Sequence, residues 1–371
     1  MKPQTTNYKP RKCGFFLILI FTLTIFSSLI SPSAHAKVTG ECVNCHTMHN
    51  SQGGTAMATY GGGSGPNSCL TRGTCLGCHG QGGASKIVTI GGSQIPQVSH
   101  TDSTDLAGGN FKYIDTADNR GHNVIALGNN DDVLTVPPSG ELGHPTSVTN
   151  TNLRCAGKFG CHGTRIDASK TEIEQLKGAH HQNVDGKCDT ATENYNSYRF
   201  LRGVKGLENT TDKWQNLTAG SHNEYYGAIT PMSNACGACH GAGQVVMPAN
   251  NTISGFCATC HGSFHLLEGI GGNTSSPFKR HPTDIVIKDS GEYASYTTYS
   301  VEAPIGRTTV PDTMSSVVSP GTDVVTCLSC HAAHGTNYPD MLRWDYSGMI
   351  AGSVSNTSGC FVCHTTKDTG G

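Results

Sequence analysis

Charged side chains and large apolar side chains are both scarce in this chain of 371 residues. Asp, Glu, Lys and Arg make up 14% of it, against the ~25% of an ordinary globular domain, and aromatic residues make up only 7%. A chain with so little apolar material has difficulty building a core from side chains alone. Either another component supplies the buried surface or the chain is disordered. The 17 cysteines and 18 histidines favour the first explanation, and the 47 glycines indicate a backbone that turns often.

Long hydrophobic runs are absent after residue 30. The one such run, residues 14–30, follows four basic residues and precedes Ala34-His35-Ala36, an A-x-A cleavage signature. This pattern predicts a secretory signal peptide over residues 1–36. The alternative is an uncleaved membrane anchor, for which 17 residues are at the lower limit of length. We expect cleavage, no membrane span in the mature chain, and export to the periplasm, the cell surface or the extracellular space.

An excess of basic charge is also missing. Removal of residues 1–36 leaves 21 basic residues against 27 acidic ones, a net charge of −6 with histidine neutral. Nucleic acids and anionic lipid surfaces are recognised through basic patches. The charge balance therefore argues against both as partners.

Twelve of the sixteen cysteines that follow residue 36 form six copies of C-x-x-C-H, the attachment signature of c-type haem. Two thiols at this spacing reach both vinyl groups of one porphyrin edge, and the next residue supplies an imidazole to the iron. We expect covalent haem c at these sites. The attaching cysteines are Cys42, Cys45, Cys75, Cys78, Cys236, Cys239, Cys257, Cys260, Cys327, Cys330, Cys360 and Cys363.

Other uses of paired cysteines fit less well. Disulfide frameworks and zinc sites do not require a histidine directly after every second cysteine. A thioredoxin-type redox site needs one C-x-x-C rather than six. The six motifs therefore identify the chain as a multihaem cytochrome c.

A seventh haem is expected at Cys155-Ala-Gly-Lys-Phe-Gly-Cys161-His162, where five residues separate the cysteines. Gly157 and Gly160 would allow the insert to loop out. Cys69 and Cys188 then remain and form one disulfide at most. The alternative is two disulfides among these four cysteines, with His162 not a ligand. The total is seven haems, and at least six.

Histidine is abundant enough to supply both axial ligands of each iron. The predicted proximal ligands are His46, His79, His162, His240, His261, His331 and His364. The first-choice distal ligands are His49, His122, His180, His181, His222, His281 and His334. The second choices are His100, His144 and His265. Irons with two histidine ligands have no open position for a substrate, which favours electron transfer over catalysis.

An internal repeat divides the mature chain. C-x-x-C-H-x-x-H begins at Cys42 and again at Cys327, and each time another C-x-x-C-H follows 33 residues later. We expect an N-terminal module over 37–105 with haems 1 and 2 and a central region over 106–232 with haem 3. A module over 233–320 would carry haems 4 and 5, and a C-terminal module over 321–371 haems 6 and 7. Histidines three apart lie on the same side of a turn, so His49 and His334 should reach a neighbouring haem rather than their own.

Regular structure should be sparse. The predicted fold is mostly irregular coil, with short helices and few short strands, wrapped around a chain of stacked haems. Helical turns are expected just after each motif, a helix over residues 171–181, and strands over 86–90 and 284–288.

These motifs resemble those of the doubled-CXXCH multihaem cytochromes c of metal-reducing bacteria, and their order is similar to that in OmcS-type extracellular filament cytochromes. The likeness rests on GECVNCHTMHNSQGG near residue 40, RGHNVIALG near 120, KRHPTD near 280 and CLSCHAAHG near 327. It implies that His122 and His281 are distal ligands, and that His49 reaches the haem of the next subunit in a filament. The widened central motif departs from the family pattern.

Three functions are consistent with the sequence. The first is an electron conduit toward extracellular acceptors such as metal oxides, which includes assembly into a homo-oligomeric filament. The second is a monomeric periplasmic carrier that docks on redox partner proteins. The third is a multihaem reductase with one five-coordinate iron, against which the surplus of histidine argues.

Overall fold

The computed structural model describes most of the chain after residue 39. The described residues are 40–58, 65–81, 83–128, 131–138, 148–163, 169–176, 198–208, 211, 214–229, 251–265, 281–352 and 357–366. The predicted signal peptide lies outside these ranges. All described residues belong to one compact unit, residues 37–371.

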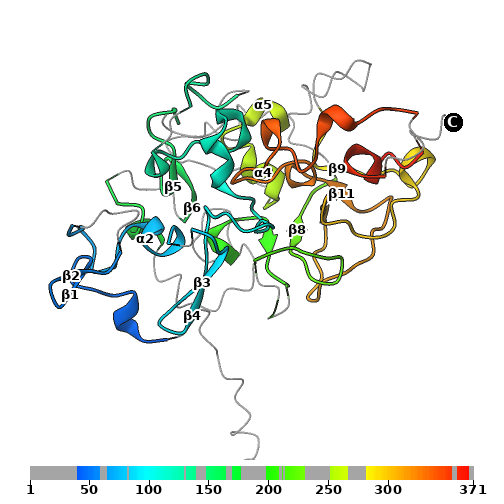
Figure 1. Ribbon diagram of the computed structural model, residues 1–371. Helices are drawn as coiled ribbons and strands as arrows, with labels where there is room; N and C mark the ends of the chain where they lie inside the picture. Colours follow the sequence, from blue (N-terminus) through cyan, green and yellow to red (C-terminus); the bar gives the residue numbers. More distant parts are fainter. Residues whose placement is uncertain are drawn as a thin grey trace, which may run out of the picture. The chain divides into compact units, whose positions relative to one another are not determined.

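Short elements joined by irregular backbone make up this unit, which confirms the predicted fold class of coil with short helices and few short strands (Figure 1). None of the helices in the described ranges has the length and apolar character needed to cross a bilayer. The α-helices are α2 (Cys75–His79), α4 (Ile253–Cys257) and α5 (Gly262–His265). The strands are β1 (Ser51–Gln52), β2 (Thr55–Ala56), β3 (Ile87–Ile90), β4 (Ser93–Pro96), β5 (Arg154–Ala156), β6 (Gly160–His162), β7 (Val204–Lys205), β8 (Glu224–Tyr226), β9 (Ile285–Val286), β10 (Ile305–Arg307) and β11 (Val324–Val325).

Single 3₁₀ turns complete the regular structure. They are η1 (Cys42–Asn44), η2 (Phe111–Asp115), η3 (Asp118–Arg120), η4 (Ile125–Leu127), η5 (Glu174–Leu176), η8 (Tyr198–Phe200), η10 (Gly291–Tyr293), η11 (Cys327–Ser329), η12 (Pro339–Met341), η13 (Tyr346–Gly348) and η14 (Gly359–Val362).

One sheet of five short strands joins segments that are far apart in the sequence. Its strand order is β7-β8-β10-β11-β9, with β8 and β10 parallel and the other pairs antiparallel. The strands come from three of the predicted segments, 106–232, 233–320 and 321–371. Backbone pairing therefore holds the haem-attachment segments together within one fold.

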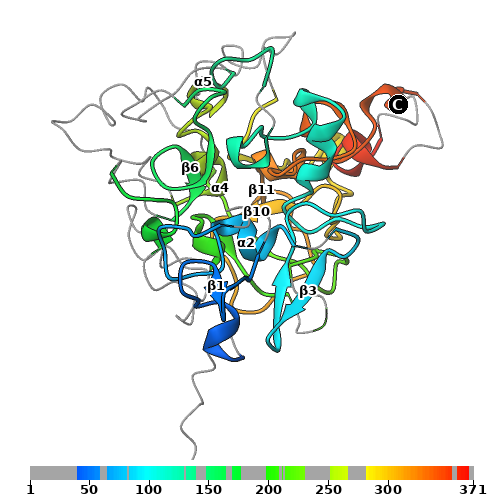
Figure 2. The same ribbon diagram turned by 60° about the vertical axis from the view of Figure 1, so that its left-hand side comes forward.

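Apolar side chains form only small clusters. One joins α4 to β7 and β8 through Ile253, Phe256, Val204 and Tyr225, and Cys161 packs against it. Two others surround Ile287 and Phe111, and they contact the half-buried Cys363 and Cys155. Figure 2 shows α4 beside β10 and β11. Each cluster lies against a cysteine of a predicted haem site, as expected where a cofactor completes the core.

The five C-x-x-C-H motifs that the structure describes themselves fold as helical turns. The amide N–H of the motif histidine donates to the carbonyl of the first cysteine in His46, His261, His331 and His364, at 2.7–3.1 Å. The expectation of turns just after each motif is thus wrong in position, except for α5 after Cys257–His261. The reason is geometric: cysteines three apart lie on one side of a turn only when the turn includes them.

The other predicted elements are present in shortened form. The run 86–90 forms β3, which pairs antiparallel with β4. The run 284–288 forms only the two residues of β9. The predicted helix over 171–181 is a 3₁₀ turn, Glu174–Leu176, as far as the structure describes it; residues 177–181 lie outside the described ranges.

Glycines allow two backbone segments to cross beside the 327–331 motif. Gly109 and Gly121 each form an isolated β-bridge with Gly335. A Cβ on Gly109 would lie 2.1 Å from the carbonyl oxygen of Gly335, so no side chain fits there. The amide N–H of His334 donates to the carbonyl of Gly108 at 2.7 Å. The crossing thereby fixes the backbone from which the His334 ring projects.

Gly109→Ala should destabilise the haem-loaded protein strongly. Gly109 has a φ of +87°, and its missing Cβ has no room, so left-handed strain and overpacking together should cost about 3 kcal/mol or more. Gly128 is a matched control, because its φ is +86° but nothing lies within 4 Å of its missing Cβ. Gly128→Ala should cost only about 1–2 kcal/mol. Denaturant unfolding of both variants measures the difference, and equal losses would contradict the close crossing.

Candidate haem-attachment and iron-ligand sites

Cysteines of successive motifs lie next to one another. The Cys45 thiol contacts Cys78, and burial together with this neighbour raises the pKa of Cys78 to about 12. The sulfurs of Cys75 and Cys155 and a carboxylate oxygen of Glu172 all lie within 4.8 Å of one another. In a haem-bound protein these sulfurs are thioethers, so their positions mark the edges of the porphyrins.

The same adjacency continues through the second half of the chain. The Cys257 thiol hydrogen-bonds to Cys327, which raises the pKa of Cys257, and Cys161 is near enough to raise it further. Burial and the neighbouring Cys363 thiol raise the pKa of Cys330 to about 12. Within the described part of the chain, a cysteine of each motif therefore lies near a cysteine of the next, from the motif at 42–46 to the motif at 360–364.

The widened central motif reaches a comparable geometry by a different route. Strands β5 and β6 pair in parallel, with Arg154 opposite Gly160 and Ala156 opposite His162. This register puts Cys155 opposite Cys161, and residues opposite each other in neighbouring strands point to one face. Gly157 has a φ of +81°, and its N–H donates to the carbonyl of His162 at 3.1 Å. The insert loops out as the two glycines predicted, and the two cysteines are brought together.

In seven of the thirteen described motif and candidate histidines, Nδ1 is hydrogen-bonded to a backbone carbonyl. Such a bond places the proton on Nδ1 and leaves the lone pair of Nε2 for a metal, as is usual for metal-bound histidine. The distances run from 2.6 to 3.0 Å. The pairs are His49 with Asn67, His79 with Pro96, His122 with Ala333, His162 with Arg199, His261 with Pro138, His281 with Pro282 and His331 with Asp340.

Burial keeps several of these imidazoles neutral. It lowers the pKa of His79, His122, His281 and His331 below the ordinary value. It lowers the pKa of His261 to about 4 and, with the neighbouring His162 adding to it, the pKa of His334 to about 3. A neutral imidazole retains the lone pair that a metal needs. The electrostatics of the sites thus favour iron ligation.

Three pairs of rings have the spacing of two ligands on one iron. A metal–imidazole bond of about 2 Å, with about 1 Å more to the ring centre, separates two opposed ring centres by about 6 Å. The observed centre distances are 6.1 Å for His122 and His261, 6.2 Å for His162 and His334, and 6.3 Å for His281 and His364. In each pair one ring belongs to an attachment motif and the other is a predicted distal ligand. The donor sets fit haem iron.

Two of the residues whose carbonyls accept from a motif histidine have a strained backbone. Arg199 and Asp340 have left-handed φ angles of 55° and 59°, which are uncommon for residues with a Cβ. Their carbonyls accept the Nδ1 bonds of His162 and His331. Strained residues are concentrated at functional sites in many proteins. Here the strain directs a carbonyl at a ligand ring.

His222, a first-choice distal ligand, has its Nε2 directed at a carboxylate. Nε2 lies 3.3 Å from Glu224, and the ring stacks on Tyr299 with centres 3.5 Å apart. Glu224 also accepts from Arg307 Nε at 2.7 Å, and Arg307 donates to Asp323 at 2.9 Å. Burial alone would raise the pKa of Glu224, but these hydrogen bonds lower it. The structure thus places His222 in a buried charge network.

The two described second-choice histidines also take part in protein hydrogen bonds. His265 Nε2 lies 2.8 Å from a carboxylate oxygen of Asp284. His100 Nδ1 lies 3.4 Å from the amide nitrogen of Asn110, and its buried Nε2 has no hydrogen-bond partner in the described part of the chain. Nε2 of His265 is therefore directed at a carboxylate, whereas Nε2 of His100 is not.

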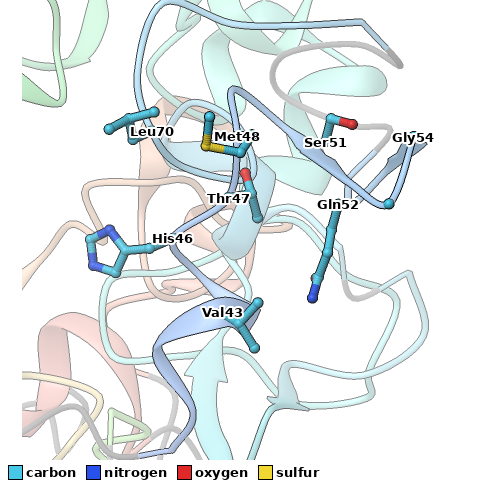
Figure 3. Close-up of a pocket in the computed structure, with 9 residues that line it drawn as sticks. Val43, His46, Thr47, Met48, Ser51, Gln52, Gly54 and Leu70 are labelled. Atoms are coloured by element: carbon cyan, nitrogen blue, oxygen red, sulfur yellow. The ribbon is translucent and has the colours of Figure 1, made fainter.

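His49 and His46 lie on an exposed face near the start of the described chain. His49 has a φ of 56°, and its ring is exposed. Beside it is a pocket of about 600 Å³ whose lining includes His46, Val43, Met48 and Leu70 (Figure 3). Val43, Met48 and Leu70 are 41%, 70% and 54% exposed. An exposed histidine that the sequence predicts as a distal ligand therefore lies beside a hollow with an apolar rim.

Some predicted site residues lie outside the described ranges. These are Cys236, Cys239, His240, His144, His180 and His181, together with Cys188. Cys69, its suggested disulfide partner, is a half-buried free thiol. The fourth haem site and the proposed disulfide remain predictions.

Two acidic residues near the sites were not expected from the sequence. Glu172 lies 3.6 Å from Cys75 and 3.5 Å from Arg154. Glu292 lies 3.2 Å from Nδ1 of His364. Neither residue belongs to a motif or has a fixed spacing from one, so only the folded chain brings them to these positions.

A family model described as the doubled CXXCH motif matches residues 320–369. The chain is 25% identical over 396 aligned residues to the C-type cytochrome OmcS of Geobacter sulfurreducens, with 90% of this chain and 85% of that protein covered.

Two solved structures also match. The outer membrane cytochrome S filament of Geobacter sulfurreducens matches at 21% identity with a TM-score of 0.45, covering 87% of this chain and 88% of that one. The OmcS nanowires of the same organism match at 20% identity with a TM-score of 0.46, covering 88% of both chains. The resemblance expected from the motifs is thereby confirmed: the chain carries the doubled CXXCH motif and is similar over most of its length to the multihaem c-type cytochrome OmcS.

Proposed function

We propose that this protein transfers electrons through a row of bis-histidine c-type haems toward extracellular acceptors such as metal oxides. The observation that carries this is the set of three ring pairs at 6.1–6.3 Å, each joining a motif histidine to a distal one. Bound haem would supply one-electron chemistry. The paired histidines would occupy both axial positions, which leaves no open position for substrate and argues against the reductase function.

The neighbouring cysteines support an order for this relay among the described motifs. The order runs through the motifs at 42–46, 75–79, 155–162, 257–261, 327–331 and 360–364, and in each step a cysteine of one motif lies near a cysteine of the next. His334 belongs to the segment after the fifth motif, yet its ring faces His162 of the third. Ala333 beside it holds the ring of His122, which faces His261. Residues 331–334 thus connect three haem sites.

Mass and spin state test this proposal directly. The mass of the mature protein should exceed that of residues 37–371 by seven haems, or by six if the central motif does not attach one. Electron paramagnetic resonance of the oxidised protein should show low-spin ferric iron without a high-spin signal. A stoichiometric high-spin signal would instead favour the reductase function.

The exposed N-terminal face supports assembly into a filament of identical subunits. His49 has Nδ1 held by the carbonyl of Asn67 at 2.9 Å, so Nε2 is prepared for a metal, while the ring is exposed. His331 is a motif histidine whose Nδ1 is likewise hydrogen-bonded to a backbone carbonyl, that of Asp340. No ring of another described histidine is stacked on or opposed to His331 within the described part of the chain. We therefore propose that His49 ligates the iron at His331 of a second copy.

Imaging separates the filament from a monomeric periplasmic carrier. The haem-loaded protein should form filaments, and His49→Ala should leave single particles that contain the same number of haems. His100→Ala is the matched control, because His100 is buried and cannot reach a second copy, so filaments should persist. Single particles for the unchanged protein under all conditions would favour the monomeric carrier that docks on redox partner proteins.

A further inference from the structure

His364 differs from seven other described histidines in the group that lies beside its Nδ1. Those seven have a neutral backbone carbonyl hydrogen-bonded at this position. Nδ1 of His364 instead lies 3.2 Å from Oε1 of Glu292, at ion-pair distance but outside hydrogen-bond geometry, and the two side chains are only 24% and 19% exposed. A charged group therefore takes the place of a neutral one at the last motif.

The fold fixes Glu292 in this position. Its backbone carbonyl accepts hydrogen bonds from Thr365, from the amide at 2.9 Å and from the hydroxyl at 2.6 Å, so the chain after His364 is bound to it. Tyr293, the next residue, packs its ring edge-on to His364 with centres 5.0 Å apart. The other neighbour of the ring is His281, at 6.3 Å. The carboxylate is thus part of a built environment around this ring.

A carboxylate at Nδ1 makes an imidazole a stronger donor to its metal. It attracts the Nδ1 proton, which raises the electron density and the basicity of Nε2. A more basic axial ligand and a negative charge near the iron both stabilise the ferric state over the ferrous state. Because both side chains are mostly buried, solvent and salt screen this effect only weakly.

We propose that Glu292 sets the haem attached at Cys360 and Cys363 apart as the one of lowest reduction potential in the chain. The inference rests on the proposed function, since it requires haem at this motif. Glu292 acts as a positioning residue through His364 and does not touch the cofactor iron. With the low-potential site at the C-terminal end of the relay, electron flow is downhill from that end toward the motifs before it.

Glu292→Gln tests the inference in the haem-loaded protein. Glutamine has the same shape, and its amide oxygen makes Nδ1 of His364 resemble the carbonyl-held histidines. We expect the reduction potential of one haem to rise by about 59 mV. At a fixed applied potential, this changes its ratio of reduced to oxidised iron roughly tenfold, since one electron is transferred. The low-spin resonance signal of one haem should change with it, while the remaining potentials stay in place.

Glu302→Gln is the matched control. Glu302 accepts from the amide of Gly359 at 2.9 Å, directly before Cys360, so it lies near the same motif without contacting the ligand ring. Glu302→Gln should shift the reduction potential of this haem by less than half of the shift expected for Glu292→Gln. An unchanged titration for Glu292→Gln, or an equal shift for Glu302→Gln, would overturn the proposal.

Two further measurements apply if Glu292→Gln does not retain its haems. In the unchanged protein, potentiometric titration should resolve one haem below all the others, and complete overlap would refute the inference. Glu292→Asp withdraws the carboxylate from Nδ1 and should also raise that potential. Failure of the proposed function is distinguishable, because it would show as missing haem mass rather than as an unshifted potential.

Discussion

His334→Ala should convert one iron from low spin to high spin while the number of attached haems stays the same. The His334 ring lies opposite His162 at 6.2 Å and stacks on Phe111 with centres 4.5 Å apart. Burial lowers the pKa of His334 to about 3, so the ring is neutral and able to bind iron. Loss of this ring removes a sixth ligand that no other described histidine is placed to replace. Electron paramagnetic resonance of the oxidised variant should show one high-spin ferric iron per protein.

His122→Ala provides a second case, and His222→Gln provides the control. His122 lies opposite His261, so its loss should produce the same signal at another haem. His222 already directs Nε2 at Glu224, and its variant should leave every iron low-spin. A high-spin signal in His222→Gln would restore His222 as a distal ligand, as the sequence predicted. A fully low-spin His334→Ala protein would show that His334 is not the ligand of the central haem.

Cys155→Ser combined with Cys161→Ser should remove one haem and interrupt the relay. The register of β5 and β6 brings these cysteines together, and each also contacts a cysteine of a neighbouring motif, Cys75 and Cys257. The mass should fall by one haem. Electrons supplied at one end should then reach the other end much more slowly, because the middle carrier is missing. Stopped-flow reduction followed at the haem absorption bands measures the delay.

Cys69→Ser is the matched control for the double variant. Cys69 is a half-buried free thiol outside every motif, so its replacement should leave the haem mass and the reduction kinetics unchanged. If the double variant keeps the full haem mass, then Cys155 and Cys161 do not attach haem. The alternative in which these cysteines form disulfides would then be correct.

The attachment motifs were predictable because their chemistry is local. Two thiols and an imidazole at fixed spacing fold as one helical turn, and the hydrogen bond from the histidine amide to the first cysteine carbonyl recurs along the chain. The scarcity of regular structure was predictable as well, from glycine content and the lack of apolar periodicity. The turns coincide with the motifs, and do not follow them, because cysteines three apart lie on one side of a turn only when the turn includes them.

The distal partners were predictable only as a set. A surplus of histidine indicates that second ligands exist, but it does not tell which ring opposes which. His222 and His334 are both first-choice distal ligands in the sequence, although only His334 lies three residues after a motif histidine. In the fold, Glu224 lies at Nε2 of His222, whereas His334 projects from a glycine crossing toward His162. His162 and His334 are more than a hundred positions apart, so the sequence alone does not show that their rings face each other.

The sequence by itself determined that this chain carries C-x-x-C-H motifs suited to covalent haem, because such a motif needs only residues that are adjacent in the chain. Within the described residues, the tertiary structure decided which motif cysteines lie close together, which histidine rings pair, and that the carboxylate of Glu292 lies beside His364. Those features depend on contacts between distant segments. A chain poor in apolar side chains makes such contacts through glycine crossings and backbone carbonyls, which leave no pattern in the order of residues.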